Sequence, residues 1–275
     1  MIDLAEKAKK IRLNTLRAFN KSGIASVGNA LSAVDILVSL YYGDLGLGPV
    51  MNFDMEKPGW AGQDYFVLSK TCSTPVLYSI LADLGFFDDA ELDYYAQLNS
   101  MLKAKPNMKI PGVSLSVGSN ASGVVKAMGL ALSLNAEKKK NKVFSLMDIS
   151  EFQNGVVWEA FSMASFKNLS NFIVFVDDNG VQKEGTIKSI LDPGFLQTKM
   201  DSFGFQVYRV TDGHDYNQIL NVVSRAFNAV RKPVLIWCQT TIGKNLGFLE
   251  NNPYYAYSSL SKAEYEELVF KFRTL

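Results

Sequence analysis

Apolar and polar positions alternate along the second half of the chain in blocks that are typical of strands and helices. Apolar, β-branched and aromatic residues fill four short runs, at 142–147, 171–177, 205–210 and 233–240. Helical stretches separate these runs, at 155–167, 194–203 and 215–230. Continuously apolar strands that alternate with helices are typical of a parallel sheet covered on both faces. We therefore predict an α/β fold, with a doubly wound parallel sheet flanked by helices.

The first half of the chain predicts mainly helices. Asn29 is a candidate N-cap for one of them, and Pro75 suits the first turn of another. The expected elements are helices at 2–20, 31–42, 89–98 and 123–137, a helix from Thr74, and a short strand at Tyr65–Leu68.

Composition narrows the class of protein. The 275 residues carry 28 Lys and Arg against 27 Asp and Glu, a net charge of +1, which argues against binding of nucleic acid or a membrane surface by bulk charge. Two cysteines, Cys72 and Cys238, suit a reducing cytoplasm, and no apolar run is long enough to cross a membrane. The single histidine, His214, excludes any mechanism that needs two imidazoles from this chain, and we expect it to be a hydrogen-bonded loop residue.

Two polar loops follow neighbouring strands of the predicted sheet. Residues 148–160 follow one strand and residues 176–185 follow the next. Ligands of parallel sheets bind at the carboxyl ends of the strands, so these loops are candidates for a site. Asp177, Asp178 and Asn179 offer the oxygen atoms that hard cations prefer, but the same residues commonly build turns. Both interpretations stay open at this point.

Seven ordered segments give the chain a family resemblance. They are IRLNTLRAFNKSG (11–23), ASVGNALSAVDILVSLYYGDL (25–45), DYFVLSKTCSTPVLYSILADLGFF (64–87), IPGVSLSVGSNASG (110–123), VVWEAFSMASFKNLSNFIVFVDDNGVQKEG (156–185), VTDGHD (210–215) and TTIGKNLGFLENNP (240–253). In this order they resemble the amino-terminal half of transketolase, and most closely the separate amino-terminal subunit of two-chain transketolases.

The resemblance implies a fold, a cofactor and a partner. Residues 1–275 are expected to form a single diphosphate-binding domain, with the pyrimidine-binding and C-terminal domains absent from this chain. The implied cofactor is thiamine diphosphate with Mg²⁺ or Ca²⁺. The implied partners are a second copy, a C-terminal transketolase-type subunit, or both. The implied activity is transfer of a two-carbon ketol unit between small sugar-like substrates such as sugar phosphates.

The resemblance also places the cofactor's metal ligands. The family's Gly-Asp-Gly triplet falls on Asp148-Ile149-Ser150, and its ligand asparagine falls on Asn179, 30 residues after Ile149. A main-chain carbonyl at Val181 completes the implied set. Isoleucine at the aspartate position has no lone pair for a hard cation. Asp148, one residue earlier, is either a substitute ligand or an acid at the N-terminus of the following helix.

The family's four imidazole positions are all replaced. They fall on Ser26, Cys72, Lys105 and Ala256. A serine or an alanine cannot exchange a proton near neutral pH, and a cysteine needs a lowered pKa to act as a thiolate. No catalytic residue of the family is therefore retained among these positions.

The remaining implied cofactor contacts lie in two loops. The family's glycine-rich segment falls on residues 118–123, so Gly118, Ser119 and Asn120 are candidate cofactor-binding residues. The alternative is a turn that caps the 123–137 helix, with Ser122 as N-cap. Ser150 and Glu151, next to the metal position, are further candidates.

Three functions remain open from the sequence. The first is a transketolase-type enzyme subunit that is impaired in conventional cofactor and metal binding. The second is a catalytically degenerate homologue that serves as a scaffold or regulatory partner. The third is an enzyme with changed chemistry, in which Cys72 and Lys105 act on another substrate.

Overall fold

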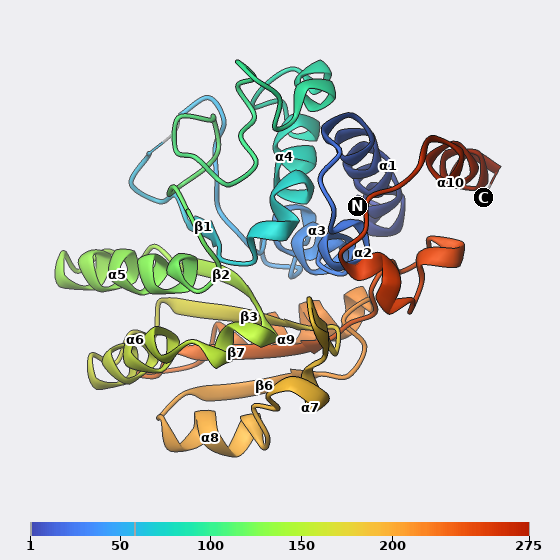
Figure 1. Ribbon diagram of the computed structural model, residues 1–275. Helices are drawn as coiled ribbons and strands as arrows, with labels where there is room; N and C mark the ends of the chain where they lie inside the picture. The colour runs from blue at the N-terminus through green and yellow to red at the C-terminus, as the bar shows by residue number, and fades with distance from the viewer. Residues whose placement is uncertain (1, 58, 275) are drawn as a thin grey trace.

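A five-stranded parallel sheet forms the centre of the molecule in the computed structural model, which describes residues 2–57 and 59–274. Its strand order is β1-β2-β3-β7-β6, and Figure 1 shows helices on both of its sides. The strands are β1 (Tyr65–Leu68), β2 (Val143–Asp148), β3 (Phe172–Asp178), β6 (Gln206–Val210) and β7 (Val234–Gln239). Every strand predicted from the apolar runs is confirmed, and so is the α/β fold.

Side chains of each strand alternate between two hydrophobic cores. Phe144 and Leu146 of β2 pack into one core, whereas Val143 and Met147 pack into the other. The first core is covered by α1 (Leu4–Ser22), α2 (Val27–Leu31), α3 (Val34–Tyr42), α4 (Thr74–Asp83) and α9 (Tyr216–Ala226). The second is covered by α5 (Ser122–Ala136), α6 (Gly155–Phe166) and α8 (Leu196–Ser202). Burial on both faces explains why the strands read as unbroken apolar runs.

Two of the predicted helices differ from the structure. The predicted helix at 31–42 is divided between α2 and α3, and Asn29 lies inside α2 instead of capping a helix. The predicted helix at 89–98 is only a short 3-10 helix, η2 (Asp89–Tyr94), and the chain leaves the helical conformation at Ala96, which has a φ of 57°. Pro75 does lie in the first turn of α4, as predicted.

The carboxyl ends of the strands lead into short elements that were not predicted. After β1 the chain forms the 3-10 helix η1 (Thr71–Ser73), and after β2 it forms η3 (Ile149–Gln153). After β3 it forms a small hairpin of β4 (Val181–Gln182) and β5 (Gly185–Thr186), followed by α7 (Ile187–Ile190). After β7 come the 3-10 helices η4 (Gly247–Leu249) and η5 (Pro253–Ala256), then α10 (Lys262–Thr274). Among the described residues, no helix has the length and apolar character needed to cross a membrane.

Candidate functional site

The carboxyl edge of the sheet brings the two predicted polar loops together. Asp148 at the end of β2 is the register partner of Asp177 near the end of β3. Lys70 lies just after the neighbouring strand β1, and Thr240 follows β7. Because all these strands are parallel, their ends lie along one edge, as the sequence predicted.

Lys70 forms the centre of this edge. Its side chain is 0% exposed, and its Nζ lies 2.7 Å from Asp177 Oδ2 and 3.0 Å from Asp148 Oδ2. Nζ also donates a hydrogen bond of 3.1 Å to Ser32 Oγ. Although burial disfavours the charged form, the carboxylates of Asp177 and Asp148 raise the pKa of Lys70 above its ordinary value. The ammonium is therefore a fixed positive charge inside the protein.

Asp177 is fully occupied by protein partners. Besides Lys70, its Oδ2 accepts a hydrogen bond of 2.7 Å from Ser32 Oγ, and its Oδ1 accepts one from Thr240 Oγ1. The Asp177 side chain is 0% exposed. It thus joins the segments that follow α2, β1 and β7, and neither of its oxygens is exposed to solvent.

Asn179 takes part in the turn that the Asp-Asp-Asn-Gly sequence favours. Its Oδ1 accepts a hydrogen bond of 3.1 Å from the Val181 backbone N–H, and Gly180 between them has a φ of 76°. Its Nδ2 donates to Asn29 Oδ1 at 2.6 Å and to Ser32 Oγ at 3.2 Å. The turn geometry is present, and the metal-ligand role of Asn179 and of the Val181 carbonyl stays a prediction.

Asp148 acts as the N-cap of η3. Its Oδ1 accepts hydrogen bonds of 2.9 Å from the Ser150 N–H and 2.6 Å from Ser150 Oγ. Its Oδ2 is buried and, among the described residues, has no partner in hydrogen-bonding geometry, although Lys70 Nζ lies 3.0 Å away. This contact is therefore an ion pair without a directional hydrogen bond. Asp148 thus lies at the N-terminus of η3 and not of the helix predicted at 155–167, and its role as a substitute metal ligand stays a prediction.

Glu151 completes the cap from inside the protein. It accepts hydrogen bonds from Ser69 Oγ at 2.5 Å, from the Ala121 N–H at 2.7 Å and from the Asp148 N–H at 2.9 Å. These contacts join the ends of β1 and β2 to the start of α5. Burial outweighs the three hydrogen bonds and raises the pKa of Glu151 to about 7. These contacts lie within the protein, and the role of Glu151 in cofactor binding stays a prediction.

The raised pKa of Glu151 makes a prediction about stability and pH. The unfolded chain releases this proton near its ordinary value of 4.5, whereas the folded protein keeps it to about 7. The folded state thus binds more protons between these values, so its stability falls as the pH rises through this window, by up to about 3 kcal/mol. We expect the Glu151→Gln variant to lack this part of the slope.

Urea denaturation of both proteins between pH 5 and pH 8 measures the effect, because their difference removes the contribution of all other titrating groups. The two curves should diverge by about 1–3 kcal/mol over the window. Parallel curves would show that Glu151 titrates at its ordinary pKa.

Ile149 leaves the expected metal position without an oxygen. Its side chain is 2% exposed and lines a cavity of about 460 Å³ together with Asp178 and Trp237. Burial raises the pKa of Asp178, against the opposing hydrogen bond of 2.8 Å that Trp237 Nε1 donates to its Oδ2. Within the described ranges, no group of three or more His, Cys, Asp or Glu side chains is placed to hold a metal ion.

These observations decide whether the implied metal fits. The family position for the aspartate is an alkyl group, Asp148 is committed to Ser150 and Lys70, and Asn179 Oδ1 is committed to its own turn. A hard cation needs several free oxygen ligands. The residues present therefore do not fit Mg²⁺ or Ca²⁺ bound in the conventional way.

Two of the four replaced imidazole positions lie on segments that contact each other. Ser26 and Ala256 lie on segments in contact: the Ser26 N–H donates to Ser258 O at 3.2 Å, and a Cβ at Gly28 would lie 2.9 Å from Tyr255 O. Ser26 itself has a φ of 139°, a strained conformation for a serine.

Lys105 is engaged by the main chain of the glycine-rich segment. Its Nζ donates a hydrogen bond to Gly118 O. The contact joins Lys105 to the segment that the family resemblance assigns to the cofactor, and its predicted part in changed chemistry stays a prediction.

Cys72 lies next to Lys70 but is not an activated thiol. Burial raises the pKa of Cys72 to about 12, even though the Lys70 ammonium acts in the opposite direction. The side chain keeps partial exposure. A thiol with this pKa is protonated at neutral pH, which weighs against the predicted chemistry that uses Cys72 as a nucleophile.

The segment 118–123 packs against the end of β1. Asn120 Oδ1 accepts hydrogen bonds of 3.1 Å from the Thr71 N–H and 2.7 Å from Thr71 Oγ1. A Cβ at Gly123 would overlap Ser69 Cα, so close packing requires this glycine.

The cap of α5 differs from the prediction. Ala121, and not Ser122, occupies the N-cap position, with a φ of 66°, and Ser122 Oγ instead donates to Ser119 O at 2.6 Å. The prediction of Ser122 as N-cap is therefore wrong. Gly118, Ser119 and Asn120 stay predicted cofactor contacts.

A second buried ion-pair cluster lies between α1, α3 and the start of α9. Arg12 donates to both oxygens of Asp35, at 3.1 and 2.5 Å. His214 Nε2 accepts from the Thr241 N–H at 2.8 Å, so Nδ1 carries the ring proton and donates to Asp35 Oδ2 at 2.6 Å. Tyr216 OH donates to Asp35 Oδ1 at 2.6 Å. The prediction of His214 as a hydrogen-bonded loop residue is confirmed.

Sequence reasoning misses the residues that hold this edge together. Lys70 lies in a segment that resembles the family, but the comparison of imidazole positions points only to Cys72. A lysine just after a strongly apolar strand is an unusual position, since lysines are rarely fully buried unless paired. That position is the signal that could have found it. Ser32, Asn29 and Thr240 have no such signal, because their partners lie far away in the chain.

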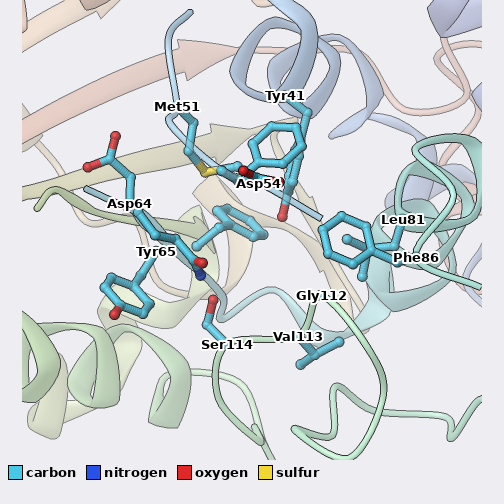
Figure 2. Close-up of a pocket in the computed structure, with 13 residues that line it drawn as sticks. Tyr41, Met51, Asp54, Asp64, Tyr65, Leu81, Phe86, Gly112, Val113 and Ser114 are labelled. Carbon is cyan, nitrogen blue, oxygen red and sulfur yellow. The ribbon is translucent and has the colours of Figure 1, made fainter. Parts of the chain in front are cut away.

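A separate aromatic cavity lies beside β1. It measures about 220 Å³ and is lined by Tyr41, Phe66, Phe86 and Asp64, among others (Figure 2). Tyr65, at the amino end of β1, also lines it. No residue that the sequence assigned to a cofactor or metal lines this cavity, so it is not the predicted site.

Comparison with known proteins identifies the family of the chain. The profile of the family described as "Transketolase, thiamine diphosphate binding domain" matches residues 4–271. The 6-deoxy-6-sulfo-D-fructose transketolase subunit SqwG of Clostridium sp. (strain MSTE9) is 33% identical over 252 residues, which are 90% of this chain and 88% of that protein. An apulose-4-phosphate transketolase subunit from Actinobacillus succinogenes is 31% identical over 254 residues, 91% of this chain and 89% of that protein.

Solved structures show the same fold. A transketolase from Campylobacter jejuni superposes with a TM-score of 0.88 at 26% identity, covering 99% of this chain but only 43% of that one. The family profile, the relatives of similar length and the fold lead to one assignment. The chain belongs to the transketolase family and corresponds to its thiamine diphosphate-binding domain.

Proposed function

We propose that this chain is the amino-terminal subunit of a two-chain transketolase-type assembly. The assembly transfers a two-carbon ketol unit between sugar-like substrates, and this subunit is impaired in conventional binding of thiamine diphosphate through a metal. Residues 1–275 act as one diphosphate-binding domain in this proposal, and a second chain provides the pyrimidine-binding site. The relatives from Clostridium and Actinobacillus support it, since both are named as transketolase subunits and match this chain over most of their length.

The contacts of Asp148 and the apolar side chain of Ile149 support the proposed loss of conventional metal and diphosphate binding. In the family pattern an aspartate at the Ile149 position contributes a negative oxygen to the cation that binds the diphosphate. Here the carboxylate next to that position, Asp148, caps η3 and pairs with Lys70. The positive charge of Lys70 is compensated by the negative charges of Asp148 and Asp177. These three groups therefore have a net charge of −1 and offer little attraction to an anion such as a diphosphate.

A degenerate homologue that acts as a scaffold or regulatory partner is the second candidate. The four replaced imidazole positions favour it, together with the raised pKa of Cys72. The two candidates differ in one measurable property, which is whether ketol transfer can be restored.

Calorimetry on the assembled two-chain complex with thiamine diphosphate and Mg²⁺ tests the proposal, with Ile149→Asp as the variant and Ile149→Leu as its matched control. We expect Ile149→Asp to bind the cofactor about tenfold more tightly than the parent or more, a gain of about 1.4 kcal/mol, and Ile149→Leu to bind like the parent. Ketol transfer measured in the same samples should rise with cofactor binding. Tight binding in the parent that Ile149→Asp leaves unchanged would contradict the impairment, and tighter binding without any ketol transfer would favour the degenerate homologue.

A further inference from the structure

We propose that the aromatic cavity beside β1 binds a small, uncharged compound with a single aromatic ring and one hydroxyl or amide group. The cavity is lined by Tyr65, the first residue of β1, and so lies at the amino end of that strand. The candidate site described above lies at the opposite edge, where the strands end. Binding of this compound is a property beyond the proposed function and does not depend on it.

Aromatic rings form several sides of the cavity, and its size suits one more ring. The Tyr41 ring meets those of Phe53 and Phe66 edge to face, with 5.7 Å between centroids in both pairs, and the Phe53 and Phe86 centroids lie 6.3 Å apart. Figure 2 shows Tyr41 and Phe86 on two sides of the cavity. An engineered protein cavity of about 150 Å³ binds benzene. The volume of about 220 Å³ therefore holds a benzene-sized ring with a small substituent, and the lining rings offer it edge-to-face contacts.

Tyr41 supplies a hydroxyl group that has no partner. The residue is 8% exposed, and no other described residue is placed to form a hydrogen bond with its hydroxyl. The adjacent Tyr42, in contrast, donates a hydrogen bond of 2.6 Å to Asp83 Oδ2. Burial alone raises the pKa of Tyr41 above its ordinary value, so the hydroxyl is protonated at neutral pH. Its oxygen is not sealed from solvent, and Tyr41 lines the cavity, so the hydroxyl is available to a molecule bound there.

Two further lining residues have polar atoms without a partner. In the part of the chain that the structure describes, Ser114 Oγ and Gln63 Nε2 form no hydrogen bond, although Gln63 Oε1 accepts one of 2.6 Å from the Gly59 N–H. Cavities that stay empty in proteins are apolar, whereas ligand sites combine an apolar wall with a few polar groups. The aromatic cavity has the second composition, which favours a ring that carries a hydrogen-bonding group.

The charges of the lining disfavour an anionic ligand. Asp54 and Asp64 line the cavity, and no Lys, Arg or His among the described residues does so. An anionic ring would approach two carboxylates without a compensating cation. Asp64 already accepts hydrogen bonds from the Asn52 N–H at 3.0 Å and the Lys142 N–H at 2.7 Å, so its carboxylate needs no cation from a ligand. These charges favour an uncharged ring.

Titration of the full chain with phenol and with toluene tests the inference. Methyl NMR signals of Met51, Leu81 and Val113 report binding directly, because these residues line the cavity. We expect phenol to shift these signals with a Kd of about 1 mM or lower. Tyr41→Phe keeps the ring and removes the hydroxyl, so the affinity for phenol relative to toluene should fall about three- to tenfold, the effect of one neutral hydrogen bond.

A control variant and a control ligand complete the experiment. Tyr94→Phe changes a tyrosine that is 56% exposed and does not line the cavity, so the ratio of phenol to toluene affinity should stay as in the parent. Benzoate, which has the same ring with a negative charge, should not shift the three methyl signals. Methyl signals that phenol leaves unshifted at 10 mM, about ten times the expected Kd, would overturn the inference. An affinity ratio that Tyr41→Phe does not change, or binding of benzoate as tight as that of phenol, would also overturn it.

Discussion

Replacement of Lys70 by methionine is expected to lower the free energy of unfolding by about 3–5 kcal/mol at pH 7. Methionine fills nearly the same volume but removes the charge between two carboxylates. Asp148 and Asp177, 2% and 0% exposed, would then face each other in the protein interior without a counter-ion. Burial of an uncompensated charge is among the few single changes that destabilise a protein this strongly. Urea denaturation monitored by tryptophan fluorescence measures the loss.

Two further variants serve as controls for this prediction. Lys139→Met removes a lysine that is half exposed and pairs with Glu137 on the surface, so we expect its free energy of unfolding to stay close to that of the parent. The triple variant Lys70→Met, Asp148→Asn, Asp177→Asn removes all three charges and should recover part of the loss. A loss below about 1 kcal/mol in Lys70→Met alone would show that the buried charges are compensated in another way.

Replacement of Asp35 by asparagine is the second change with a large expected effect. The Asp35 carboxylate accepts hydrogen bonds from Arg12, His214 and Tyr216, and both it and Arg12 are 2% exposed. Asparagine keeps the shape but leaves the Arg12 guanidinium buried without a charge partner. We expect a loss of about 3–5 kcal/mol at pH 7 by urea denaturation. The exposed Asp201→Asn serves as the control, with a change within about 0.5 kcal/mol.

The effect of Asp35→Asn should depend on pH with a definite sign. Although burial opposes it, the Arg12 charge and the His214 hydrogen bond hold the pKa of Asp35 well below its ordinary 3.8. A carboxyl group with a lowered pKa adds stability that is fully present above the unfolded value and disappears as the pH falls through the folded one. The difference between parent and variant should therefore shrink only below about pH 4. A difference that is constant down to pH 2 would contradict a stabilising contribution from the ionised Asp35 carboxyl group.

The sequence predicted the sheet better than the helices around it. Each central strand is buried on both faces, so its length is apolar and its ends are sharp, as for Phe172–Asp178. The break between α2 and α3 has no such signal. Ser32 lies in this break, where its Oγ donates to Asp177 Oδ2 at 2.7 Å and lies 2.9 Å from Asn29 O. A tertiary contact thus accompanies the division of a segment whose apolar pattern reads as one helix.

The sequence predicted which edge of the sheet holds the candidate site, but not which side chains contact one another there. The rule that ligands bind at the carboxyl ends of parallel strands placed Asp148 and Asp177 on one edge, and the register of β2 and β3 confirms it. The ion pairs with Lys70 depend on a third strand, and no spacing in the sequence encodes a distance between separate strands. The family resemblance located the unusual Ile149, but only the structure shows that Asp148 is already engaged.

The most direct test of the account that this site does not bind a divalent metal ion in the conventional way is a crystal structure of the parent protein soaked in Mn²⁺, with diffraction data collected near the manganese absorption edge. The account predicts no anomalous peak at the carboxyl edge of the sheet, with Lys70 Nζ in contact with both Asp148 and Asp177. An anomalous peak bound to Asp148 and Asn179, with Lys70 displaced from Asp148, would contradict it.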